Sequence, residues 1–133
     1  DYYLTAFGAS RAAYTGKFAR EQLSGDGHYG FHTPFATLHA FNGWADKFLA
    51  TPPQGIEDRY VAVEATLHGF TAVLGWHDFR AAAIPRSFGQ EWNLSVSRKL
   101  GDRYELLGKF ADYRADGFAT DTRKAWLMLT ANL

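Results

Sequence analysis

Hydrophobic and polar residues alternate most clearly over residues 89–100, in the sequence GQEWNLSVSRKL. The even positions hold the apolar side chains Trp92, Leu94, Val96 and Leu100. The odd positions hold the polar side chains Glu91, Asn93, Ser95, Ser97 and Lys99. Successive side chains point to opposite faces of a β-strand, so this spacing predicts a strand with one apolar and one polar face. Arg98 interrupts the apolar face near its end, where a long side chain reaches water along its own methylene stem.

The same alternation recurs along the chain and predicts an all-β protein whose consecutive strands pair antiparallel, in an up-and-down order. The predicted strands are residues 2–9, 14–23, 59–68, 70–80, 89–100, 104–114 and 122–133. Several have about 9–11 residues, the length that a tilted strand needs to cross a bilayer.

The connections between these strands alternate in length. Short connections lie at 10–13, 68–69 and 101–103, and longer ones at 24–57, 81–88 and 115–121. Outer-membrane barrels have short turns on one side and long loops on the other. The chain is therefore predicted to form part of an antiparallel up-and-down transmembrane β-barrel, with about seven strands.

Eight charged residues of the predicted strands share the polar parity of their strands. A charge that faces lipid in mid-membrane costs about 2–4 kcal/mol, so a lumen-lining face is expected to collect them. Any solvated sheet face would show the same bias. The predicted lumen-facing residues are Lys17, Glu21, Glu64, Glu91, Lys99, Glu105, Lys109 and Lys124.

The longest connection, about 28–57, exceeds the roughly 12–15 residues beyond which loops usually carry function or are disordered. Apolar residues three or four positions apart, with Pro34 after Thr33, predict one or two short helices in it. Its aromatic part, 35–48, is expected either to fold inward and narrow a pore or to pack over the barrel rim for stability. The candidate constriction residues are His39, Trp44, Asp46 and Lys47.

Composition narrows the functional classes. The formal net charge of zero argues against nucleic acid as the main partner. Cysteine is absent, so no disulfide framework or thiolate metal site is expected. Aromatic residues make up 17% of the chain, which fits the aromatic girdles of a membrane barrel and also an aromatic-rich soluble β domain. The 133 residues are interpreted as one β-barrel segment that begins without Met or a signal-peptide pattern, either a mature chain or a fragment.

Candidate chemistry is sparse. His28 and His32 lie four positions apart without a carboxylate in matching register, so no metal site is predicted. Asp26 follows a glycine in turn-forming sequence but lacks the further oxygen ligands of a calcium loop. Ser24 and Ser87 have no nucleophile-elbow motif around them. Neither an enzymatic activity nor a cofactor is expected.

Residues 31–49, FHTPFATLHAFNGWADKFL, resemble a loop segment of the alginate-export-type family of bacterial outer-membrane porins. The resemblance rests on Thr33, Pro34, His39, Phe41, Gly43, Trp44, Asp46 and Phe48. Residues 57–60 (EDRY), 77–80 (HDFR) and 121–124 (DTRK) add to it, so that it covers most of the chain. It implies the C-terminal part of a barrel in the outer membrane of Gram-negative bacteria, inserted by the barrel-assembly machinery and surrounded by outer-membrane lipid. The implied activity is a channel for small or polymeric solutes, such as oligosaccharides or alginate.

The chain departs from that family in three ways. It ends in Leu133, where such barrels end in an aromatic residue. Seven strands cannot close a barrel of the family's size, about eighteen strands, so an N-terminal part is expected to be missing. The mixture of lysine and glutamate on the polar parity is not the strongly basic lumen expected of a polyanion exporter.

Two function classes follow from these patterns. The first is a passive channel whose lumen charges set its selectivity. The second is a soluble, lipocalin-like barrel that binds a small apolar ligand. They predict opposite directions for the apolar parity, which faces lipid in the channel and an enclosed ligand in the soluble barrel.

Overall fold

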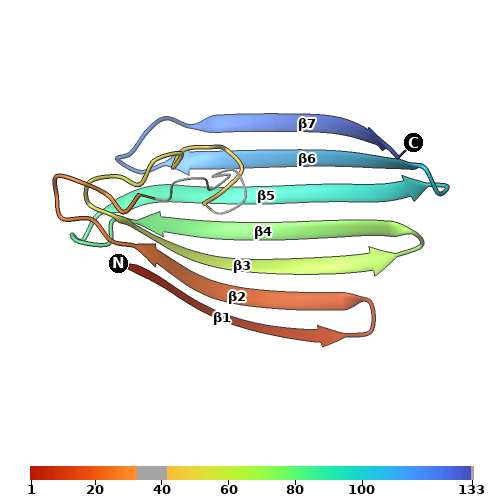
Figure 1. The fold of residues 1–133 in the computed structure, drawn as a ribbon, viewed down its shortest axis with the longest axis horizontal. Helices are drawn as coiled ribbons and strands as arrows, with labels where there is room; N and C mark the ends of the chain where they lie inside the picture. The colour runs from red at the N-terminus through yellow and green to blue at the C-terminus, as the bar shows by residue number, and fades with distance from the viewer. Residues whose placement is uncertain (33–41, 133) are drawn as a thin grey trace.

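The protein forms one seven-stranded antiparallel sheet in a computed structural model that describes residues 1–32 and 42–132 (Figure 1). The strands are β1 (Tyr2–Arg11), β2 (Tyr14–Leu23), β3 (Ile56–Leu67), β4 (Phe70–Arg80), β5 (Ser87–Leu100), β6 (Tyr104–Ala115) and β7 (Thr122–Ala131). Each strand pairs with the next in the chain, so the order in the sheet is the order in the sequence. No helix in the described residues is long and apolar enough to cross a membrane.

The predicted all-β, antiparallel, up-and-down arrangement is confirmed, and the strand boundaries differ by a few residues. β3 begins three residues earlier than predicted, because Ile56, Glu57 and Asp58 pair with the end of β2. The short turns contain Ala12, His68 and Gly69 at positive φ, the conformation that a tight hairpin requires. All three short turns lie at one end of the sheet and the long connections at the other (Figure 1).

The sheet is open. β1 and β7 form its two edges, and each has one hydrogen-bonded neighbour in the described chain. These seven strands therefore do not form a closed barrel by themselves. Of the predicted architecture, the structure confirms the antiparallel sheet.

The register divides the strand residues between two faces that differ in chemistry. The polar face carries all eight residues predicted to line a lumen, since directly paired residues share a face: Lys17, Glu21, Glu64, Glu91, Lys99, Glu105, Lys109 and Lys124. The apolar face carries large side chains that nothing in the described chain covers: Trp92 is 51% exposed, Leu94 43% and Leu127 78%. The apolar residues consequently do not enclose a dry interior.

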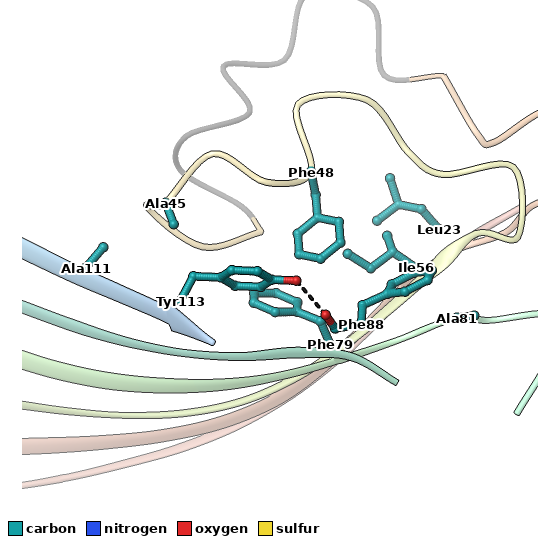
Figure 2. Close-up of a cluster of buried hydrophobic side chains, with 9 residues drawn as sticks. All are labelled: Leu23, Ala45, Phe48, Ile56, Phe79, Ala81, Phe88, Ala111 and Tyr113. Atoms are coloured by element: carbon teal, nitrogen blue, oxygen red, sulfur yellow. Dashed lines mark hydrogen bonds between the residues drawn. The ribbon is translucent and has the colours of Figure 1, made fainter. Parts of the chain in front are cut away.

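The hydrophobic core is small and lies on the polar face, at the end with the long connections (Figure 2). Phe48 inserts between the long connection and the sheet, with its ring centroid 4.6 Å from Phe79 and 5.2 Å from Phe118. The Tyr113 hydroxyl donates to the carbonyl oxygens of Phe88 (2.5 Å) and Phe118 (3.0 Å), so its polar atom is satisfied within the core. Burying a phenylalanine side chain of this kind contributes roughly 1.5–3 kcal/mol.

The predicted helices are absent from the described parts of the long connection, 28–32 and 42–55, which consist of turns, bends and irregular backbone with an isolated bridge at Gly30. Gly43 (φ 78°) and Asp46 (φ 59°) adopt left-handed backbone conformations that interrupt a right-handed helix. The apolar spacing instead delivers Ala45 and Phe48 to the sheet. The remaining residues of that pattern, Phe35, Leu38 and Phe41, lie outside the described residues.

Candidate functional site

Residues 42–50, called the inner loop from here on, fold onto the polar face of the sheet. Asn42, Gly43, Ala45 and Phe48 are buried against it, whereas Leu49 and Ala50 are exposed. The inner loop thus occupies the face that carries the charged strand residues, close to the end with the long connections (Figure 1).

Glu91 on β5 holds the start of the inner loop. Its side chain is fully buried, and its Oε1 accepts hydrogen bonds from the backbone N–H groups of Trp44 (2.5 Å) and Ala45 (2.9 Å). Gly43 packs directly on the same carboxylate, since a Cβ at this position would lie 2.5 Å from Oε2. Hydrogen bonds to a charged acceptor contribute about 1.5–3 kcal/mol, so Glu91 anchors the inner loop strongly.

Two lysine side chains of the sheet also contact the inner loop. Lys124 Nζ on β7 donates to Asp46 Oδ2 at 2.7 Å. Lys109 Nζ on β6 lies 4.1 Å from the ring centroid of Trp44 and 5.5 Å from that of Trp126. A cation over an aromatic face at these distances is attracted by the ring quadrupole. The inner loop is therefore held by the buried Glu91 carboxylate of β5 and by the lysine side chains of β6 and β7.

Lys47 is the cation that the inner loop itself contributes to the polar face. Its Nζ lies 5.8 Å from the ring centroid of Tyr113 on β6. Together with Asp46, it places one charge of each sign over the sheet.

A second polar cluster lies on β2, β3 and β4. Glu21 accepts hydrogen bonds from the Tyr2 hydroxyl (2.9 Å) and from the Asn42 amide (3.3 Å). Its direct strand partner is Asp58, a fully buried carboxylate that contacts His77 Nδ1 at 2.9 Å. Three buried carboxylates, Glu21, Asp58 and Glu91, consequently lie on one face close to the inner loop.

A hollow of about 130 Å³ lies between the inner loop and the sheet. Trp44, Tyr60, His77 and Asn93 contribute to its lining. Asn93 is 2% exposed, and neither its amide nitrogen nor its amide oxygen has a hydrogen-bond partner among the described residues. A liquid water takes up about 30 Å³, so the hollow has room for a few waters or for part of a polar solute.

Asp26 was expected to lie in turn-forming sequence, and the chain bends at residues 27–28, between the bridged glycines Gly25 and Gly30. Asp26 Oδ1 accepts hydrogen bonds from the backbone N–H groups of Tyr29 (2.7 Å) and His28 (2.8 Å). These bonds, that of Tyr29 above all, lower the pKa of Asp26 below its ordinary value, because they favour the charged carboxylate. Within the described ranges, no three His, Asp or Glu side chains gather as a metal site.

The predicted site residues divide into three groups. Glu21 and Glu91 are buried near the inner loop, and Lys109 and Lys124 contact it. Three residues lie toward the short-turn end: Glu64, Lys99 and Glu105. Lys17 Nζ lies 5.1 Å from the ring centroid of Tyr60. Of the constriction candidates, Trp44, Asp46 and Lys47 lie in the inner loop, and His39 falls outside the described residues. Their lumen-facing role stays a prediction.

Sequence reasoning missed Asn42 and did not assign Asp58 a role. Asp58 lay before the predicted start of its strand at Arg59 and was noted only within the family resemblance. Its parity is that of Tyr60, so extending the alternation by two residues would have placed it on the polar face. Asn42 has no comparable signal, because its position depends on how the long connection folds.

No family model, curated protein or solved structure matches this chain. The resemblance to alginate-export-type porins therefore stays a prediction, supported by the sequence segments quoted above.

Proposed function

We propose that this chain forms part of the wall of a channel in a bacterial outer membrane, with its apolar face toward lipid and its polar face toward a water-filled lumen. The observation that carries the proposal is the separation of the two faces. One face exposes large apolar side chains over the middle of all seven strands and carries its charged residues toward the strand ends. The other face carries charged residues along the strands, together with a folded loop. A soluble sheet of this size would cover such an apolar face.

The apolar face has the composition expected of a lipid contact. On β4 and β5 its central residues are Ala72, Leu74, Trp76, Trp92 and Leu94, without a charge among them. Tyr14, Phe70 and Tyr104 lie near the short-turn end, as in an interfacial aromatic girdle. The strands have 10 to 14 residues, enough to span a bilayer when tilted.

The inner loop supports a channel that is narrowed rather than empty. It folds onto the proposed lumen side and carries Trp44, Asp46 and Lys47 there. Charges of both signs surround it, so the proposed lumen attracts neither anions nor cations alone. A lumen of this chemistry would pass polar solutes. The family resemblance adds saccharides as a class of solute.

Closure of the channel requires strands beyond these seven, because β1 and β7 are both open edges. The proposal therefore places this chain in a larger barrel, inserted by the barrel-assembly machinery. It involves no enzymatic step and no cofactor.

The decisive experiment is conductance. The protein that carries this chain is purified in detergent and reconstituted into a planar bilayer, and stepwise current with a size cut-off for neutral oligosaccharides is the expected result. The rival function, a soluble barrel for an apolar ligand, predicts a folded monomer in detergent-free buffer without conductance. That outcome would overturn the channel.

A further inference from the structure

Five arginines form a row at the long-connection end of the apolar face, and this row is called the arginine belt. Each is largely exposed, with 45–62% of its side chain accessible. Its members are Arg20, Arg59, Arg80, Arg114 and Arg123.

The arginine belt borders the apolar residues directly. Arg59 lies two residues before Val61 on the same face of β3, and Arg20 lies two residues after Phe18 on β2. On β7, Arg123 lies two residues before Ala125. Two residues along a strand correspond to about 7 Å, so the guanidinium groups lie within one side-chain length of the apolar surface.

Three carboxylates lie between these arginines and are much less exposed. Glu57 accepts from Arg59 Nε at 2.5 Å and also pairs with Arg20. Asp78 accepts from Arg80 Nε at 2.7 Å. The Glu57 and Asp78 side chains are only 9% and 10% exposed, so the carboxylates lie beneath the guanidinium groups.

Asp112 on β6 repeats this arrangement near the β7 edge of the sheet. It contacts Arg114 at 3.2 Å and Arg123 at 3.3 Å, and its side chain is 22% exposed against 56% and 62% for the two arginines. A fourth carboxylate, Asp121, lies 3.8 Å from Arg114 and is 64% exposed. Five guanidinium groups therefore accompany four carboxylates, three of them much less exposed than the arginines, and the surface presented outward keeps an excess of cations.

We propose that the arginine belt binds the phosphate groups of membrane lipids in the leaflet on the long-connection side. This inference rests on the proposed function, which puts the apolar face in contact with lipid. A guanidinium group presents paired N–H donors that match the oxygens of a phosphate. The neighbouring carboxylates hold each guanidinium group in place. In outer-membrane barrels the long loops are extracellular, so the lipid is the phosphorylated glycolipid of the outer leaflet.

The charges lie where headgroups would meet the barrel. Lipid phosphates sit just beyond the acyl chains, and the arginine belt sits just beyond the apolar residues of the same face. A free anion in solution would have no reason to favour this border over the lysines of the polar face.

The test compares lipid retention by three forms of the protein that carries this chain. The test variant combines Arg59→Gln, Arg80→Gln and Arg123→Gln. The matched control combines Arg11→Gln and Arg98→Gln, which remove cations from the short-turn end of the same face. A third form, with Asp112→Asn, Asp121→Asn, Arg114→Gln and Arg123→Gln, removes these paired charges together, so that neither carboxylate is left without its arginine.

Each form is reconstituted in phosphatidylcholine vesicles that contain a diphosphorylated glycolipid or its dephosphorylated counterpart, and the lipid that copurifies is quantified. The wild type and the matched control are expected to enrich the diphosphorylated lipid. The test variant is expected to lose about tenfold or more of this enrichment, since each basic residue near an anionic surface strengthens binding and three are removed. The third form is expected to lose part of the enrichment of the diphosphorylated lipid.

Unchanged enrichment in the test variant would overturn the inference, as would equal retention of the dephosphorylated lipid. Complete displacement of the glycolipid by millimolar inorganic phosphate would also overturn it, since the site would then be one for small anions. Conductance of the same samples separates the two proposals. A wild type that does not conduct contradicts the channel, whereas a conducting test variant with undiminished lipid enrichment contradicts the arginine belt alone.

Discussion

Gly43 lies on the carboxylate of Glu91 so closely that a Cβ atom would come 2.5 Å from Oε2. Gly43 also has a φ of 78°, which side chains other than glycine rarely adopt. The inner loop can therefore approach β5 only with glycine at this position. The backbone N–H groups of the next two residues then reach Oε1 of the same carboxylate.

Replacing Gly43 by alanine is expected to lift the start of the inner loop from the sheet. The positive φ alone costs of order 1 kcal/mol, and the collision with a buried carboxylate adds to it. Faster hydrogen exchange at the Trp44 and Ala45 amides would measure the change. Gly69→Ala is the matched control, because Gly69 has a φ of 79° and nothing within 4 Å of a Cβ. Equal effects on the inner loop from both substitutions would contradict the contact with Glu91.

Glu91→Gln keeps the shape of the side chain and removes its charge. The amide oxygen can still accept from Trp44 and Ala45, but two charge-assisted bonds become neutral ones. A loss of about 1–2 kcal/mol in the stability of the loop-closed state is expected. Glu91→Ala is expected to cost more, since it leaves two buried N–H groups without their acceptor. The opening free energy from native-state hydrogen exchange would rank the two variants, and the reverse order would contradict this role.

The alternation of side chains gave the strands and their faces, because the two-residue period is a local property of the backbone. Glu91 and Lys124 could be assigned to the polar face in this way. Their contacts with the inner loop could not be predicted, since the Glu91 carboxylate bonds an amide 47 residues away and Lys124 an aspartate 78 residues away. Such contacts depend on the path of the long connection.

The helical spacing of Ala45 and Phe48 was misleading for a related reason. Their spacing reflects contacts with the sheet, while Gly43 and Asp46 set the backbone conformation. Barrel closure also lies beyond a sequence pattern, because alternation specifies that a strand has two faces and not how many strands surround a lumen.

The ion pair between Lys124 and Asp46 is expected to influence conductance more than stability. Both side chains are partly exposed, so breaking the pair is expected to change unfolding by no more than about 1 kcal/mol. Asp46→Lys alone would place two lysines together, displace the inner loop and change the single-channel current. The exchange of both residues, Asp46→Lys with Lys124→Asp, is expected to restore most of the wild-type current. A double-mutant cycle of current and stability would measure the coupling, and strictly additive effects would contradict it.

The orientation of the sheet can be tested at two neighbouring residues of one strand. Leu94 belongs to the apolar face and is 43% exposed, whereas Ser95 belongs to the polar face. Leu94→Arg and Ser95→Arg add the same charge one residue apart in the middle of β5. If the apolar face meets lipid, Leu94→Arg is expected to cost about 2–4 kcal/mol, and Ser95→Arg much less. Folding yield into detergent micelles or vesicles, with denaturant unfolding of the inserted protein, would measure both.

The same pair of variants distinguishes the channel from the soluble barrel. In a soluble barrel that encloses an apolar ligand, Leu94→Arg would abolish ligand binding and leave folding independent of lipid. In the channel, Ser95→Arg adds a cation to the lumen and should shift ion selectivity toward anions, while Leu94→Arg should leave the selectivity of whatever protein inserts unchanged. A selectivity shift from Leu94→Arg and none from Ser95→Arg would mean that the two faces are assigned the wrong way round.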